Sequence, residues 1–94
     1  MPRAKKKKSR LEELLELPRE LNSQIPKITI VGFEEMLIEN YKGIFEYEEN
    51  LARINTHTGT ITISGFNLGL NQMTEDDILI TGKIDSIEWE SITD

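Results

Sequence analysis

The stretch Thr60-Ile61-Thr62-Ile63-Ser64-Gly65 (residues 60–65) alternates hydroxyl side chains with isoleucines and ends in a glycine. Successive side chains of a β-strand point to opposite faces, so the alternation predicts a strand with Ile61 and Ile63 on an apolar face and a wet opposite face. The four residues before it, Thr-His-Thr-Gly, predict a four-residue hairpin loop in which Gly59 takes a positive φ.

Short runs of the same kind fill the chain from Pro26 to Trp89. They are rich in β-branched residues and separated by turn formers, and they cover residues 27–32, 36–38, 43–47, 51–55, 60–65, 68–70 and 78–82. Such runs at a spacing of about ten residues are typical of an all-β domain. We expect turns at residues 65–67 and 73–76. The loss of alternation between Ile84 and Ile87 predicts a bulge or bend before Ile87 and Trp89.

These patterns favour an all-β fold class, built as an antiparallel sheet or small sandwich. The units between Ile44 and Ile84 are loosely self-similar, which leaves a short β-solenoid as the alternative. A body of this size buries only about 60% of its unfolded-chain surface and leaves open strand edges. We therefore expect a homo-oligomer.

The first 25 residues differ in composition from the rest. Residues 1–8 are expected to be a disordered basic tail, because the consecutive Lys5, Lys6, Lys7 and Lys8 repel one another. Residues 9–25 are expected to be a helical segment, which precedes a β domain over residues 26–94. The helical segment starts with Ser-Arg-Leu-Glu (9–12), which matches a capping box. Leu11, Leu14 and Leu15 then form the apolar stripe of a short amphipathic helix.

Charge is distributed unevenly along the chain. Residues 1–10 carry six basic residues and no acid, whereas the remainder carries five basic residues against seventeen acidic ones. A +6 segment thus precedes a −12 body, which together give the net charge of −6. The lysines are a candidate electrostatic tether for an anionic membrane surface or an acidic partner, with a solubilising role as the alternative. An acidic body with scattered aromatics is not what a nucleic-acid reader presents, so we do not expect nucleic acid as a partner.

No constellation of residues points to catalysis. The chain has no cysteine, and His57, its one histidine, lies in a predicted turn and is interpreted as a solvated residue. Three acidic clusters, at residues 34–35, 48–49 and 75–77, are interpreted as solvated turns, with cation binding as the weaker alternative. Phosphate-binding glycine loops are absent from the sequence. We therefore expect no enzymatic activity, no cofactor, and no catalytic, cofactor-binding or metal-binding residue.

The sequence contains no apolar run near the roughly twenty residues that a membrane-spanning helix needs. Glutamates interrupt the leucines after the basic start, unlike the core of a signal peptide. The acidic polar face of the predicted helix suits docking on the sheet or on a partner protein better than insertion into lipid. We expect a cytoplasmic protein.

Several segments read as family motifs rather than as generic strands. They are Leu-Glu-Leu-Pro-Arg-Glu (15–20), Pro-Lys-Ile-Thr (26–29), Ile-Glu-Asn-Tyr-Lys-Gly-Ile (38–44), Arg-Ile-Asn-Thr (53–56), Gly-Thr-Ile-Thr-Ile-Ser-Gly (59–65) and Ile-Thr-Gly-Lys-Ile-Asp-Ser-Ile-Glu (80–88). Together they resemble the YabP/YqfC family of sporulation proteins. The lysine-rich start before a leucine helix is more similar to the YqfC type.

The resemblance implies a sporulation role in endospore-forming bacteria. It links the chain to spore coat or envelope formation in the mother cell. Together with the absence of a catalytic constellation and the open strand edges, it favours a non-enzymatic assembly or adaptor protein, with a peripheral location at the forespore membrane as one variant. It also implies a membrane sporulation protein of the YqfD type as a partner. The alternative function is a peripheral membrane-binding module that the polybasic tail tethers.

Overall fold

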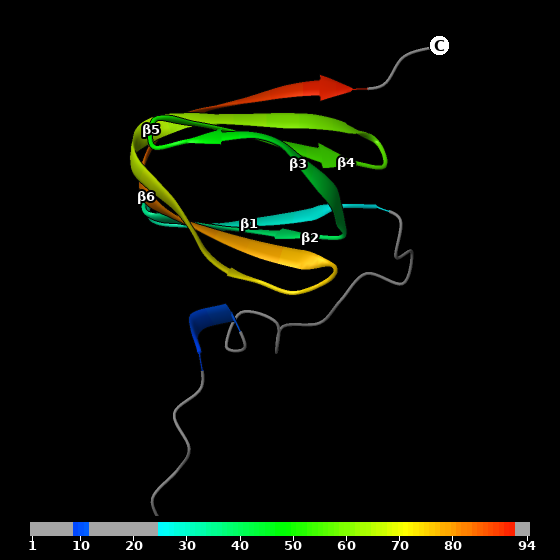
Figure 1. Ribbon diagram of the computed structural model, residues 1–94, viewed down its shortest axis with the longest axis horizontal. Helices are drawn as coiled ribbons and strands as arrows, with labels where there is room; N and C mark the ends of the chain where they lie inside the picture. The colour runs from blue at the N-terminus through cyan, green and yellow to red at the C-terminus, as the bar shows by residue number, and fades with distance from the viewer. Residues whose placement is uncertain (1–8, 12–24, 92–94) are drawn as a thin grey trace, which may run out of the picture.

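The computed structural model describes residues 9–11 and 25–91 (Figure 1). Residues 25–91 contain six strands: β1 (Lys27–Val31), β2 (Glu35–Glu39), β3 (Tyr41–Glu48), β4 (Leu51–Thr56), β5 (Gly59–Met73) and β6 (Asp77–Ser91). They form one sheet in the order β1-β2-β6-β5-β4-β3, and every neighbouring pair is antiparallel. The predicted all-β antiparallel fold is confirmed. The β-solenoid alternative is wrong, because its strands would stack in parallel.

The sheet folds over on itself because β5 and β6 are each fifteen residues long and belong to two layers. The lower layer contains β1, β2 and the paired residues 69–73 of β5 and 77–81 of β6. The upper layer contains β3, β4 and the paired residues 59–65 of β5 and 84–91 of β6. In Figure 1 the end of β6, in red, lies in the upper layer, and its start, in orange, lies in the lower layer.

The backbones of β5 and β6 approach each other closely at Gly65 and Gly82, where the sheet bends from one layer into the other. We call this place the fold line. A Cβ atom on Gly65 would overlap the Lys83 carbonyl oxygen, and one on Gly82 would lie 2.5 Å from the Asn67 carbonyl oxygen. Gly82 also takes a φ of 128°, which favours glycine. The turn predicted at residues 65–67 is wrong. The chain continues as β5 through a bulge, because the Leu68 N–H donates to the Glu49 carbonyl at 2.7 Å and so keeps a backbone partner.

Two other predicted irregularities occur in the structure. The partner of Gly65 is Ile84 and that of Ser64 is Ser86, so Asp85 is skipped and the bulge predicted before Ile87 is confirmed. The turn predicted at residues 73–76 lies between β5 and β6, where the Thr74 hydroxyl accepts the Asp77 N–H at 3.0 Å.

The hairpin between β4 and β5 is tighter than the predicted four-residue loop. Only His57 and Thr58 connect the strands. The Thr56 hydroxyl accepts the Gly59 N–H at 3.1 Å and donates to the Gly59 carbonyl at 2.7 Å, and these bonds draw both flanking residues into the ladder. Gly59 takes a positive φ of 157°, as expected.

A single residue also connects the lower layer to the upper layer between β2 and β3. Asn40 joins β2 to β3 with a φ of 66°, and its N–H donates to Asp77 Oδ1 at 3.3 Å. The next N–H, of Tyr41, donates to the Asp76 carbonyl at 3.0 Å. The β5–β6 turn therefore fixes the point at which the chain passes from the lower layer to the upper one.

The main hydrophobic core lies between the layers. Its buried members come from four strands, β2, β4, β5 and β6, and are Met36, Ile38, Ala52, Ile54, Ile61, Ile63, Leu68, Ile78, Ile80 and Ile84. Ile61 and Ile63 are buried, whereas Thr60 and Thr62 on the other face remain half-buried. The predicted alternation of an apolar and a wet face in this strand is confirmed.

Candidate functional site

Leu11 lies on the outer face of the lower layer. It is 4% exposed and forms a second apolar cluster with Leu37 and Leu79. Its N–H donates to Gln72 Oε1 at 3.0 Å. The Arg10 guanidinium bonds both carboxylate oxygens of Glu35, at 2.8 and 2.9 Å. Leu11, the first residue of the predicted apolar stripe, is thus packed against its own sheet.

Backbone geometry at Arg10 and Leu11 is helical, and the rest of the predicted helix lies outside the described residues. The same holds for the other two residues of the stripe, Leu14 and Leu15, and for the tether of Lys5, Lys6, Lys7 and Lys8. The structure therefore places one of the seven predicted site residues, and it does not show the seven brought together.

The acidic clusters differ from the prediction at two positions. Glu35 begins β2, is half-buried and is paired with Arg10, so its interpretation as a solvated turn residue is wrong. Glu34, Glu48, Glu49, Glu75 and Asp76 are exposed, as solvated turn residues should be. Asp77 is only 3% exposed, so its interpretation as a solvated turn residue is wrong. It is buried because its carboxylate accepts the Asn40 N–H and the Thr74 hydroxyl, at 3.3 and 3.4 Å. His57 is exposed in its hairpin, as expected. Within residues 9–11 and 25–91, no three histidines or carboxylates come together as a metal site would need.

The end of β6 is a free strand edge. We call residues Ser86–Ser91 the β6 edge. β2 pairs with β6 only over residues 77–81, so across the described part of the chain the β6 edge has β5 as its single strand neighbour. Its side chains alternate between the two faces of the sheet. Ile87 and Trp89 lie opposite Ile63 and Ile61, on the core side. A strand with one unpaired side presents N–H and C=O groups that another chain can pair with.

Glu88 and Glu90 occupy the outer side of the β6 edge, opposite Thr62 and Thr60. Both glutamates are exposed, as is Asp85 in the bulge just before them. The edge itself contains no basic residue. The nearest cation along the row is Arg53, which Thr62 separates from Glu88 and which pairs with Glu46 at 3.9 Å. The outer side of the β6 edge is therefore acidic.

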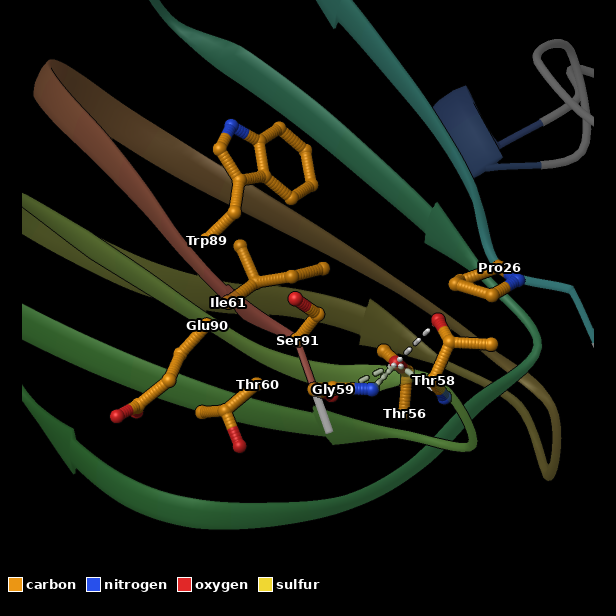
Figure 2. A pocket seen from close by; sticks show the side chains of 9 residues that line it. All are labelled: Pro26, Thr56, Thr58, Gly59, Thr60, Ile61, Trp89, Glu90 and Ser91. Atoms are coloured by element: carbon orange, nitrogen blue, oxygen red, sulfur yellow. Dashed lines mark hydrogen bonds between the residues drawn. The ribbon is translucent and has the colours of Figure 1, made fainter. Parts of the chain in front are cut away.

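A hollow opens beside the β6 edge. It has a volume of about 140 Å³. Its lining residues come from the start of β1, the β4–β5 hairpin and the end of β6; they are Pro26, Thr56, Thr58, Gly59, Thr60, Ile61, Trp89, Glu90 and Ser91. Figure 2 shows Trp89 and Ile61 on one side of the edge and Glu90 and Thr60 on the other. Trp89 is 62% exposed although its cross-strand partner Ile61 is buried.

The sequence prediction missed this site. It treated Trp89 as one of several scattered aromatics, since alternation over residues 87–90 alone does not tell whether the strand has a second neighbour. A usable signal was present in the charges, because acidic residues alternate with large apolar ones over residues 87–90. Chemically, an acidic edge, an exposed indole and a small hollow suit the binding of an extended chain.

In the part of the chain that the structure describes, no helix has the length and apolarity to cross a bilayer.

Comparisons with known proteins agree with the resemblance in the sequence. The model of the YabP family matches residues 22–94. The chain belongs to the YabP family. Within it, the chain is similar to the uncharacterized protein YqfC of Bacillus subtilis (strain 168), with 32% identity over 87 residues that cover 93% of this chain and 94% of the relative. No solved structure matches the chain.

Proposed function

We propose that this YabP-family protein is a non-enzymatic assembly or adaptor component of sporulation that acts in spore coat or envelope formation in the mother cell. The observation that carries the proposal is the β6 edge, which combines an unpaired strand side with the exposed Trp89 and an adjacent hollow. Strand edges bind other chains by main-chain hydrogen bonds, and neighbouring pockets select the side chains. Family membership and the sporulation role that the resemblance implies support this setting.

The composition of the hollow supports binding over chemistry. Threonines, a proline, an isoleucine and a tryptophan form most of its lining, and Glu90 supplies its one carboxylate. Acid–base catalysis needs positioned titratable groups that act on a bound substrate. Aromatic anchors at the rim of an apolar hollow are instead typical of interaction sites.

The alternative proposal is a peripheral membrane-binding module, at the forespore membrane in the first instance. The six basic residues among residues 1–10 favour it. Arg10 and Leu11, which follow the lysines in the sequence, lie on the outer face of the lower layer. In a polybasic cluster, each lysine near an anionic membrane surface contributes about 1 kcal/mol to binding.

Two measurements on the purified full-length chain separate these proposals. Light scattering over a concentration series tests self-association without lipid, which the assembly role predicts. Co-sedimentation with vesicles of phosphatidylserine and phosphatidylcholine at low and high salt tests the tether, whose binding should weaken with salt because exposed charges are screened. Neutral phosphatidylcholine vesicles are the control. A protein that stays monomeric and ignores both vesicles would contradict both proposals.

A further inference from the structure

We propose that the β6 edge binds the basic N-terminal segment of a second copy of this chain, residues 2–8, as an added strand. The proposal deepens the assembly function above and rests on it. It names the edge that is used and the segment that fills it.

The charges of the free edges single out β6. The β6 edge and the bulge before it carry Asp85, Glu88 and Glu90 without a basic residue. β1, the first strand in the sheet order, carries Lys27 and no acid, and the lower-layer end of β5, residues 69–73, carries no charge. β3, the last strand, mixes Lys42 with glutamates. A basic strand is therefore attracted most strongly to β6.

The same charges disfavour pairing of two β6 edges with each other. An antiparallel pair centred on Trp89 would place Glu88 of one copy beside Glu90 of the other. Like charges directly opposite each other in a sheet are destabilising. A second copy therefore has to supply a different segment, and the +6 start of a chain whose body is −12 is the complementary one.

The segment supplies basic side chains to the outer side of the edge. In an extended chain Arg3, Lys5 and Lys7 share one face, and Lys6 and Lys8 share the other. In an antiparallel register with Lys5 opposite Glu90, Lys7 lies opposite Glu88. Both pairs fall on the wet face of the upper layer, where opposite charges across strands stabilise the pairing.

The intervening positions face the inner side. In the same register Ala4 lies opposite Ser91, and its small side chain enters the hollow without filling its volume of about 140 Å³. Lys8 lies opposite the half-buried Ile87 and extends its ammonium past that side chain into solvent. Lys6 lies opposite Trp89, whose exposed indole is the aromatic ring that binds an ammonium best. Pro2 precedes the paired residues, a place where proline costs no ladder hydrogen bond.

The contact joins two different surfaces and is therefore head-to-tail. Each copy uses the β6 edge of one neighbour and offers its own segment to the next. Such heterologous contacts close into a ring or continue as a filament. Arg10 and Leu11 lie on their own sheet two residues after the segment ends, so the proposed link between copies is short.

Trp89 is the only tryptophan of the chain and so reports on this contact by itself. In a dilution series of the full chain, we expect its emission to shift to shorter wavelength as concentration rises, in step with the mass from light scattering. Lys5→Glu with Lys7→Glu should raise the midpoint concentration of both changes by about tenfold or more. Lys42→Glu with Lys83→Glu is the matched control, because both lysines are exposed elsewhere and the net charge changes equally.

A charge exchange tests the register. Glu88→Lys with Glu90→Lys should weaken self-association alone, and mixing this variant with the Lys5→Glu, Lys7→Glu variant should restore it. An unchanged mass and emission in the Lys5→Glu, Lys7→Glu variant would overturn the inference and leave the assembly function standing if the wild type still associates. If the Trp89 emission already lies at the shorter wavelength at every concentration while the mass stays that of a monomer, the segment binds within its own chain. That result would also overturn the inference. If the Lys5→Glu, Lys7→Glu variant loses vesicle binding but self-associates as the wild type does, the segment binds membranes instead and the inference is overturned.

Discussion

At the residue scale, a few positions fix how the sheet folds over. Gly82 combines a φ of 128° with a backbone neighbour at a distance that no Cβ atom tolerates, and Gly65 meets the facing strand equally closely. Gly43, by contrast, lies in β3 with nothing near the place of a Cβ atom. Glycine is therefore required at positions 65 and 82 on the fold line, and it can be replaced at position 43 in β3.

Gly82→Ala should destabilise the protein by about 1–3 kcal/mol, because alanine would hold a left-handed backbone and press on the Asn67 carbonyl. Gly43→Ala is the matched control, and it should leave stability unchanged or slightly raised, since alanine has less freedom to lose on folding. Urea unfolding followed by circular dichroism measures both. Equal losses at the two sites would contradict the account of the fold line.

Ile63→Ala should cost about 2–4 kcal/mol, because it opens a cavity between the layers. Thr62→Ala, its neighbour on the outer face, should cost less than half of that. The same unfolding experiment compares them. Similar costs would mean that the outer face of the upper layer is also buried, for instance in an oligomer.

At the element scale, local pattern identified most strands but not their ends. Alternation located β1, β2, β3 and β4, since each is a short run bounded by turn formers. The sequence pattern divides β5 at Gly65 and β6 at Gly82, because glycine usually interrupts a strand. Whether a glycine ends a strand or bends it depends on the strand opposite, and here the facing residues Asn67 and Lys83 come from the same long hairpin. That information is absent from any local window.

The docked N-terminal segment contributes to stability through Leu11. Leu11→Ala should lower the free energy of unfolding by about 2–4 kcal/mol, because a buried leucine over Leu37 and Leu79 is truncated. Hydrogen exchange should quicken in β2 and the start of β6 before it does in β4. Deletion of residues 1–8 is the control, and at a concentration low enough that the chains do not associate it should leave the thermal midpoint nearly unchanged. A fall of more than a few degrees on deletion would show that the tail is part of the fold.

At the scale of the whole molecule, pairing order and the free edge could not be predicted from the sequence. β2 neighbours β6 rather than β3, although a single residue separates β2 from β3. The side chains of β2 read equally well as a central or an edge strand. The exposure of Trp89 follows from this topology, because β2 covers only the first part of β6. The candidate site is thus a product of the arrangement of strands and not of a motif.

Self-association is the whole-molecule prediction. The wild-type chain should show a mass above that of a monomer at high micromolar concentration, because a free edge and an exposed indole gain by burial. Replacing Leu14 and Leu15 with glutamate tests the other predicted contact: it should lower the mass if the stripe joins copies, or unfold the protein if the stripe packs on its own sheet as Leu11 does. A clean monomer at that concentration would contradict self-association and, if the protein also ignores vesicles, both proposed functions.

The place of β2 in the sheet has a consequence for synthesis. Its residues 36–38 are fully buried, yet the strand that covers one of its sides, residues 77–81 of β6, lies about forty positions later. Pairings between distant parts of a chain form slowly. On the ribosome, the β1–β2 hairpin must therefore wait with an apolar strand exposed until nearly the whole protein has emerged. Chains that stop before Asp77 should aggregate, whereas completed chains hide that strand in a single late step.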